Sequence, residues 1–302
     1  MRILVAGATG YVGRRLCTRF SESGFELWAL SRDAQRAEDS GLGVERAIEW
    51  RPEAGPPPGA AFDGVSLVIN LIGERISGIW TPAKRRAIRS SRELGTRNII
   101  AGLAEASDRP EALISASAVG YYGDCADAEL TEHSPPGDDF FAETCQAWER
   151  EALNARQLGI RVACLRSAPL IGANSPMLRS VLPPFRLGLG GRMGSGRQLW
   201  PWLHIDDMIG AVEFILDRQL DGPINMVSPE AVTQKEFARS LGRVLRRPAL
   251  FPVPAFALKF ALGDLAPELL ASRKVVPRKL LDSGYEFKFT DLESALQDAI
   301  GS

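Results

Sequence analysis

Apolar runs of strand length alternate with amphipathic segments through the first half of the chain. The runs at residues 2–6, 65–70 and 112–117 are largely apolar, a pattern typical of strands buried on both faces of a parallel sheet. Longer segments with helical spacing follow, notably residues 82–106 and 141–157. This alternation predicts an α/β fold built on a doubly wound parallel sheet.

The first apolar run ends in a turn with three glycines, directly before an amphipathic segment. The first glycine allows the turn, the second lets the backbone approach a ligand, and the third lets the helix pack on the strand. A helix N-terminus here offers unpaired N–H donors and partial positive charge, which suit a pyrophosphate. The alternative is a purely structural turn. The residues expected to hold a dinucleotide are Gly7, Thr9, Gly10, Tyr11, Val12 and Gly13.

The residues after the second strand, which we expect at 26–30, select the nucleotide. A carboxylate here would accept hydrogen bonds from a ribose diol and repel a 2′-phosphate. This chain has Ser31 and Arg32, a hydroxyl and a guanidinium that suit a phosphate monoester. Asp33 lies one position further and leaves NAD open. We predict NADP as the cofactor.

Further cofactor contacts are expected where other strands end. Ligands of parallel sheets bind at the carboxyl ends of the strands. Leu71, Ile72 and Gly73 follow the strand at 65–70, and Ser115 lies in the next strand. Arg92, on the long helix between these strands, is positioned to point back to the phosphates.

Beyond residue 166 the pattern changes to glycine-rich loops, and a helix and a strand return within residues 205–228. We therefore expect a Rossmann-type domain in residues 1–166, to which 205–228 return. Residues 167–302 are expected to form a smaller C-terminal α/β region.

Composition narrows the class of protein. The 302 residues are 45% hydrophobic and 24% charged, as in ordinary globular proteins. The net charge of -1 gives no chain-wide basic field, so we expect neither nucleic acid nor a membrane as partner. Four scattered cysteines and two histidines argue against a metal site. No signal-peptide core precedes the first strand, and the apolar stretch 254–262 is too short to span a bilayer, so we expect a cytoplasmic protein.

The turn at residues 7–13 resembles the GxxGxxG fingerprint of extended short-chain dehydrogenase/reductases, the fold shared by nucleotide-sugar epimerases. Other segments match in the same order: residues 70–73, 115–118, 122–123, 165–166 and 204–207. The chain resembles more narrowly the atypical "epimerase family" members with a C-terminal extension, through residues 140–149, 184–191, 200–204 and 274–277. The resemblance covers nearly the whole chain. It associates Ser-Arg after the second strand with NADP.

One departure from that family pattern concerns catalysis. Active members use a Tyr-x-x-x-Lys pair, in which the lysine lowers the pKa of the tyrosine, and a nearby Ser or Thr orients the substrate. Alignment on Glu149 puts Phe141 at the tyrosine position and Cys145 at the lysine position. Neither can perform that proton transfer. Ser117, at or near the orienting serine, and Tyr121 are the remaining candidate catalytic residues, with water as another proton source.

Four other polar side chains have plainer explanations. Packing beneath the loop is the alternative explanation for Tyr122, as it is for Tyr121, and a helix start or a solvated position is the alternative for Glu74 and Glu143. His204 belongs to a His-x-Asp-Asp element that the resemblance associates with bracing between domains.

Two functions follow from these residues. The first is NADP(H)-dependent oxidoreduction or epimerisation of an unidentified small molecule, with an unusual acid/base group. The second is a non-catalytic NADP(H)-binding regulatory or scaffold protein with a protein partner, because the resemblance extends to plastid and cyanobacterial relatives linked to cell division. A third reading is a degenerate fold that binds nothing. Analogy with the family also implies a homodimer formed through the helices at 82–106 and 141–157.

Overall fold

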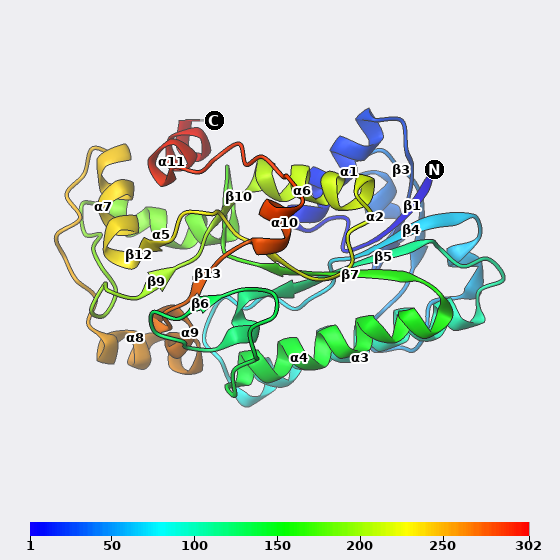
Figure 1. Cartoon of the computed structure of the whole chain (residues 1–302), viewed down its shortest axis with the longest axis horizontal. Coiled ribbons are helices and arrows are strands. Elements are labelled where there is room, and N and C mark those ends of the chain that lie inside the picture. Colours follow the sequence, from blue (N-terminus) through cyan, green and yellow to red (C-terminus); the bar gives the residue numbers. More distant parts are fainter. Residues whose placement is uncertain (302) are drawn as a thin grey trace.

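A seven-stranded, wholly parallel sheet forms the centre of the molecule, for which a computed structural model describes residues 1–301 (Figure 1). The strand order is β11-β7-β5-β4-β1-β2-β3. The strands are β1 (Arg2–Ala6), β2 (Glu26–Ser31), β3 (Val44–Glu49), β4 (Val65–Asn70), β5 (Ala112–Ala118), β7 (Arg161–Ser167) and β11 (Gly222–Met226). The predicted doubly wound α/β class is therefore confirmed.

Helices cover both faces of this sheet. The two long helices α3 (Pro82–Glu105) and α4 (Phe140–Leu153) run side by side over one face, whereas α1 (Tyr11–Glu22) and α6 (Ile205–Asp217) cover the other (Figure 1). The short helix α2 (Ala34–Glu38) packs beside β3. The N-terminus of α3 is set by its capping residues, because the Thr81 hydroxyl accepts the Lys84 N–H and Pro82 occupies the first turn.

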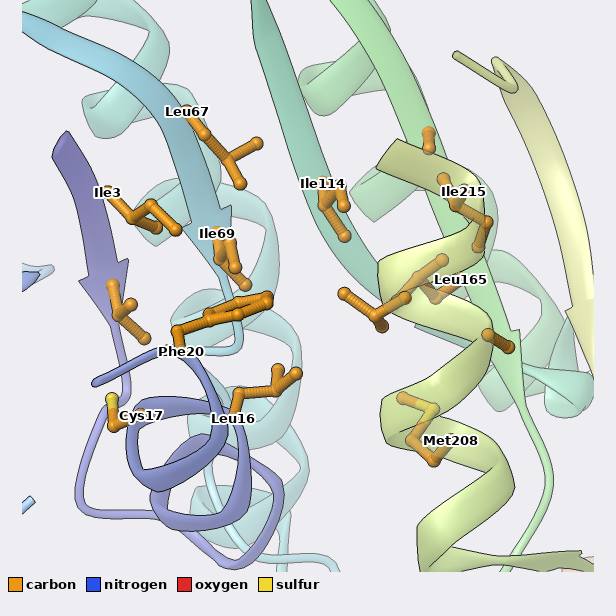
Figure 2. Close-up of a cluster of buried hydrophobic side chains, with 14 of the residues drawn as sticks. Ile3, Leu16, Cys17, Phe20, Leu67, Ile69, Ile114, Leu165, Met208 and Ile215 are labelled. Carbon is orange, nitrogen blue, oxygen red and sulfur yellow. The ribbon is translucent and has the colours of Figure 1, made fainter. Parts of the chain in front are cut away.

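The period-2 alternation of the strands divides the core into two layers. Ile3, Ile69, Ile114 and Leu165 face the α1–α6 side, where Phe20 and Met208 also lie (Figure 2). The alternate positions of the same strands, Leu4, Val68, Leu113 and Val162, face α3 and α4. This double burial explains why the strands are apolar on both faces.

A smaller region lies beyond the carboxyl ends of the strands (Figure 1). It has its own core, which includes Trp202, Phe237 and Leu296. The capping box of α7 is present, since Thr233 and Glu236 bond each other's backbone N–H groups. The helices of this region are α5 (Pro176–Arg186), α7 (Gln234–Val244), α8 (Ala255–Leu262), α9 (Ala266–Leu270) and α11 (Leu292–Gly301), whereas the short helix α10 (Arg278–Asp282) packs on β11 of the central sheet. Its short strands are β6 (Glu129–Leu130), β8 (Leu170–Ile171), β9 (Leu199–Trp200), β10 (Leu203–His204), β12 (Val232–Thr233) and β13 (Lys274–Val275), and 3₁₀ turns occupy 59–62, 119–122, 154–158 and 263–265.

The start of α6 ties the C-terminal segment to the sheet. The buried Asp207 carboxylate accepts the backbone N–H groups of Lys288 at 2.7 Å and Phe289 at 3.0 Å, and Tyr285 donates to the Asp207 carbonyl. Within residues 1–301, no helix has the length and apolar character needed to cross a membrane.

Candidate cofactor and active site

The glycine turn lies between the carboxyl ends of β1 and β4, where the direction of strand order reverses. Gly7 has φ +92°, and an added Cβ would lie 3.0 Å from the Leu71 carbonyl oxygen. A Cβ on Gly13 would lie 2.2 Å from the Gly7 oxygen, so only glycine lets α1 approach this closely. Gly10 is the N-cap of α1 and provides no side-chain cap. The first-turn N–H groups are therefore open to an anion.

Thr9, Tyr11 and Val12 complete the turn and the start of α1. The Thr9 carbonyl accepts the Arg14 Nε–H at 3.1 Å, and Val12 is half-buried in the first turn of α1. The Tyr11 hydroxyl is buried, with no hydrogen-bond partner among the described residues. Burial raises the pKa of Tyr11, so this hydroxyl stays neutral.

The loop after β2 uses its acidic residue structurally. The Asp33 carboxylate accepts the Arg36 N–H at 3.0 Å and caps α2, while the Ser31 hydroxyl donates to the Asp33 carbonyl at 2.8 Å. Arg32 is exposed between them. A surface pocket opens beside this loop, lined by Arg14, Asp33, Gln35, Arg36, Asp39 and Ser40. The carboxylate that could have bound a ribose diol thus has another partner.

The loop after β4 carries the next predicted contacts. Leu71 extends the sheet by donating its N–H to the Ala6 carbonyl, and the Ile72 N–H bonds the Asn70 amide oxygen. Gly73 lies against Arg92, whose guanidinium carbon would be 3.1 Å from an added Cβ.

Arg92 is held by backbone carbonyls at this loop. Its Nη1 donates to Glu74 O at 3.1 Å and Ile88 O at 3.0 Å, and the guanidinium lies 5.0 Å from the Trp148 ring centroid. Burial lowers its pKa. Arg92 thus lies beside Gly73, and its contact with the cofactor phosphates stays a prediction.

The two serines of β5 are both buried. Ser115 accepts a long hydrogen bond from the Asn70 side chain, 3.4 Å. Ser117, the predicted orienting serine, donates to the Glu149 carboxylate at 2.6 Å. The Ser117 hydroxyl is therefore part of a buried polar network.

That network centres on an ion pair between α4 and β7. Arg166 forms two hydrogen bonds of 2.8 Å with Glu149, and both side chains are almost wholly buried. Arg166 also donates to the Tyr122 hydroxyl at 3.0 Å, and Tyr122 donates to Asn225 at 2.6 Å. Sequence reasoning matched Glu149 and Arg166 to a family pattern without giving them a role. An arginine at the end of an otherwise apolar strand was the signal for such a pair.

Tyr121 lies above this arginine. The Arg166 guanidinium carbon is 3.4 Å from the centroid of the Tyr121 ring, and the ring meets Tyr122 edge-to-face at 5.3 Å. Tyr121 is half-buried, and its hydroxyl has no hydrogen-bond partner within residues 1–301. Of the two predicted catalytic residues, it has the free hydroxyl.

Phe141 and Cys145, which the sequence alignment puts at the dyad positions, are both buried. Phe141 joins Trp80, with ring centroids 4.9 Å apart, and Phe140 at 6.1 Å. Burial, aided by Glu149, raises the pKa of the Cys145 thiol to about 12, so it remains protonated.

The remaining polar candidates have partners. Glu74 pairs with Lys84 at 2.5 Å, and this hydrogen bond lowers the pKa of the carboxyl. Glu143 lies on the surface, 3.8 Å from Arg89. His204 caps α6 by accepting the Asp206 N–H, and burial lowers its pKa. Residues 1–301 contain no group of three His, Cys, Asp or Glu side chains able to hold a metal.

Known proteins resemble this chain along its whole length. The NAD dependent epimerase/dehydratase family matches residues 3–227, and a domain of unknown function, DUF1731, matches 253–299. The Arabidopsis thaliana epimerase family protein SDR39U1 homolog, chloroplastic, is 35% identical over 98% of this chain and 86% of its own length. Epimerase family protein YfhF of Bacillus subtilis is 32% identical over 99% of this chain and 98% of its own. Human epimerase family protein SDR39U1, crystallised with NADPH, superposes with a TM-score of 0.87 at 32% identity, covering 100% of this chain and 99% of that chain.

The sheet order and the glycine turn at its switch point define a Rossmann-type protein of the extended short-chain dehydrogenase/reductase class. The chain belongs to the NAD dependent epimerase/dehydratase family, within its SDR39U1-like epimerase family proteins. The resemblance inferred from sequence is confirmed.

Proposed function

We propose that this protein is an NADP(H)-dependent oxidoreductase or epimerase acting on a small molecule without the Tyr-x-x-x-Lys pair. The observation that carries the choice of NADP(H) is the capping role of Asp33, whose carboxylate bonds the Arg36 N–H at 3.0 Å. Arg32 is left exposed directly after β2, where its guanidinium suits a 2′-phosphate. The human relative was crystallised with NADPH, which agrees with this choice.

The cofactor would be held by groups on or directly after four strands of the sheet, β1, β2, β4 and β5, and by one residue of α3. The open N–H groups at the start of α1 suit its pyrophosphate, and Ser31 with Arg32 suits the 2′-phosphate. The remaining contacts fall to Leu71, Ile72, Gly73, Arg92 and Ser115. When bound, the nicotinamide supplies or accepts a hydride.

The proton that accompanies hydride transfer would come from Tyr121. Its ring rests on Arg166, which fixes the side chain, and its hydroxyl has no partner in the described structure. Ser117 is a poorer donor because it already donates to Glu149 at 2.6 Å. Positioned acid groups contribute roughly 10²- to 10⁴-fold in rate.

Titration of NADPH and NADH against intrinsic tryptophan fluorescence tests the cofactor. Arg32→Ala should weaken NADPH binding about 10- to 100-fold, the value of a charged hydrogen bond, and leave NADH unchanged. Arg150→Ala, on the exposed side of α4, is the matched control. Equal losses for both nucleotides would refute the 2′-phosphate assignment.

Catalysis is tested by NADPH oxidation against a panel of aldehydes, quinones and nucleoside-diphosphate ketosugars. Tyr121→Phe keeps the ring on Arg166 and removes the proton donor, so kcat should fall by at least 10²-fold while the Kd for NADPH stays constant. Ser117→Ala should affect stability more than kcat. An unchanged kcat in Tyr121→Phe would contradict the role of Tyr121.

The second candidate is a non-catalytic NADP(H)-binding protein with a regulatory or scaffold role, as in cell division. The packed rings of Trp80, Phe140 and Phe141 support it, because the sequence alignment puts Phe141 at the position of the usual acid. Tight NADPH binding with no turnover of any carbonyl in the panel would support this function over the first. A homodimer through α3 and α4 is compatible with both, as is a cytoplasmic location, where the four free cysteines would stay reduced.

A further inference from the structure

A group of large apolar side chains is exposed at one end of the molecule. We call it the apolar–basic surface; its apolar members are Leu187, Leu189, Leu250, Phe251, Phe256 and Phe260. Phe260 is 95% exposed and Leu250 is 77% exposed. Single exposed apolar residues are common, but six on two adjoining segments form a patch of the kind that marks an interaction site.

Backbone pairing brings the two segments together. The Phe251 N–H donates to Gly190 O at 3.1 Å, and the Val253 N–H donates to Arg192 O at 2.8 Å. Glycine at 191 permits the contact, because an added Cβ would lie 2.1 Å from the Phe251 oxygen. The loop after α5 therefore lies against the segment that joins α7 to α8 along the left edge of Figure 1.

Helix α8 continues this surface. Phe256 and Phe260 are one turn apart and therefore project from the same side, while Leu258 is buried against the protein. Two phenylalanines that face solvent on an eight-residue helix contribute no buried apolar surface to the core.

The two segments that carry these residues have charged side chains of one sign only. Residues 174–205 and 242–262 contain arginine and lysine but neither aspartate nor glutamate. The exposed cations of these segments without an ion-pair partner in the described structure are Arg179, Arg186, Arg197, Arg246, Arg247 and Lys259. The net charge of the whole chain is -1, because acidic residues elsewhere offset these cations. The expectation of no membrane partner rested on that net charge and not on the local concentration of cations.

We propose that the apolar–basic surface binds the surface of a membrane that contains anionic lipid. Exposed phenylalanine and leucine side chains insert at the boundary between headgroups and acyl chains, and surrounding arginines and lysines attract the lipid charge. A second copy of this chain would bring the same cations against each other, which disfavours self-association here. The attachment is peripheral, because α8 has only 8 residues.

Flotation of the full-length protein with vesicles tests this proposal. It should float with vesicles of phosphatidylcholine mixed with phosphatidylglycerol and remain below pure phosphatidylcholine vesicles. Raising NaCl to about 0.5 M should release it, because the Debye length falls well below its value of about 8 Å at physiological salt. Equal flotation with both vesicle types, or none with either, would overturn the proposal.

Two double variants locate the contact. Phe256→Ser with Phe260→Ser should abolish flotation, and Arg247→Glu with Lys259→Glu should lower the vesicle affinity by at least tenfold, since each basic residue contributes on the order of fivefold. The matched controls, Leu281→Ser for the first and Arg150→Glu with Arg218→Glu for the second, should float as the wild type does.

Two further measurements complete the test. Light scattering should give one mass for the wild type and the phenylalanine variant, and both should bind NADPH equally. A wild-type dimer that becomes a monomer in the phenylalanine variant would assign the surface to self-association instead.

Discussion

Removing Arg166 is the sharpest perturbation of the buried network. Arg166→Met would leave the Glu149 carboxylate buried, with only the Ser117 hydroxyl of its present side-chain partners. Breaking a buried ion pair from one side costs about 3 to 5 kcal/mol, largely because the other charge remains unpaired. The hydrogen bonds to Tyr122 and the Glu132 carbonyl are lost as well. We therefore expect the upper part of that range.

The cost should be visible in thermal and urea unfolding. With an unfolding entropy of about 2.1 cal/mol/K per residue, a loss of 3 to 5 kcal/mol lowers the Tm of this chain by about 5 to 8 °C. Urea unfolding should show the same loss as a lower midpoint with an unchanged slope.

A double-mutant cycle separates the ion pair from simple loss of packing. Glu149→Leu combined with Arg166→Met removes both charges, so the double variant should be more stable than Arg166→Met alone, by about 2 kcal/mol. Free energies of unfolding that simply add would refute the reasoning, as would a cost below about 1 kcal/mol for Arg166→Met.

Three further predictions concern separate parts of the structure. Gly13→Ala would force a Cβ to within 2.2 Å of the Gly7 oxygen, so both the NADPH affinity and the Tm should fall. The control Gly301→Ala, which has open space around it, should change neither. Equal behaviour of the two variants would contradict the close approach of α1. Cys145 should resist iodoacetamide in the folded protein and react in urea, because burial raises its pKa to about 12. Peptide mass spectrometry measures the labelling. Fast labelling of the thiol in the folded protein would refute its burial. Burial lowers the pKa of His204 in the folded protein, so the neutral ring stabilises the fold at pH values above the pKa of histidine in the unfolded chain. This stabilisation is lost as the pH falls through the pKa of His204 in the folded protein. The urea midpoint should therefore drop between about pH 7 and 5, less so in His204→Gln; identical profiles would exclude His204 as the cause.

The parts of the fold that the sequence predicted are those encoded locally. Strand burial, the glycine turn and the Thr233 capping box each depend on residues within a few positions of one another. The Ser31–Arg32 pair is also local, since it lies at the end of β2, and its role in selecting the nucleotide stays a prediction.

The buried network depends on contacts that no local pattern encodes. Glu149 is on a helix and accepts a hydrogen bond from Ser117 of β5. Arg166, on the strand that follows, donates to Tyr122 of the 3₁₀ turn at 119–122, and Tyr122 in turn donates to Asn225 of β11. Sequence alone could align Ser117 with an orienting serine, but not show that its hydroxyl bonds a buried carboxylate. The apolar–basic surface was hidden for the same reason, since only backbone pairing brings residues 190–192 and 251–253 together.

The position of Leu280 limits how the chain can fold during synthesis and which segments can be exchanged between related proteins. Leu280 packs in the sheet core with Ile224 of the edge strand, and Asp207 holds the backbone of Lys288 and Phe289. During synthesis the ribosome must release residues beyond 280 before this side of the sheet is covered. A chimera that swaps residues 253–299 as a cassette would therefore need matching partners in β11 and α6, because the C-terminal family match is no independent folding module.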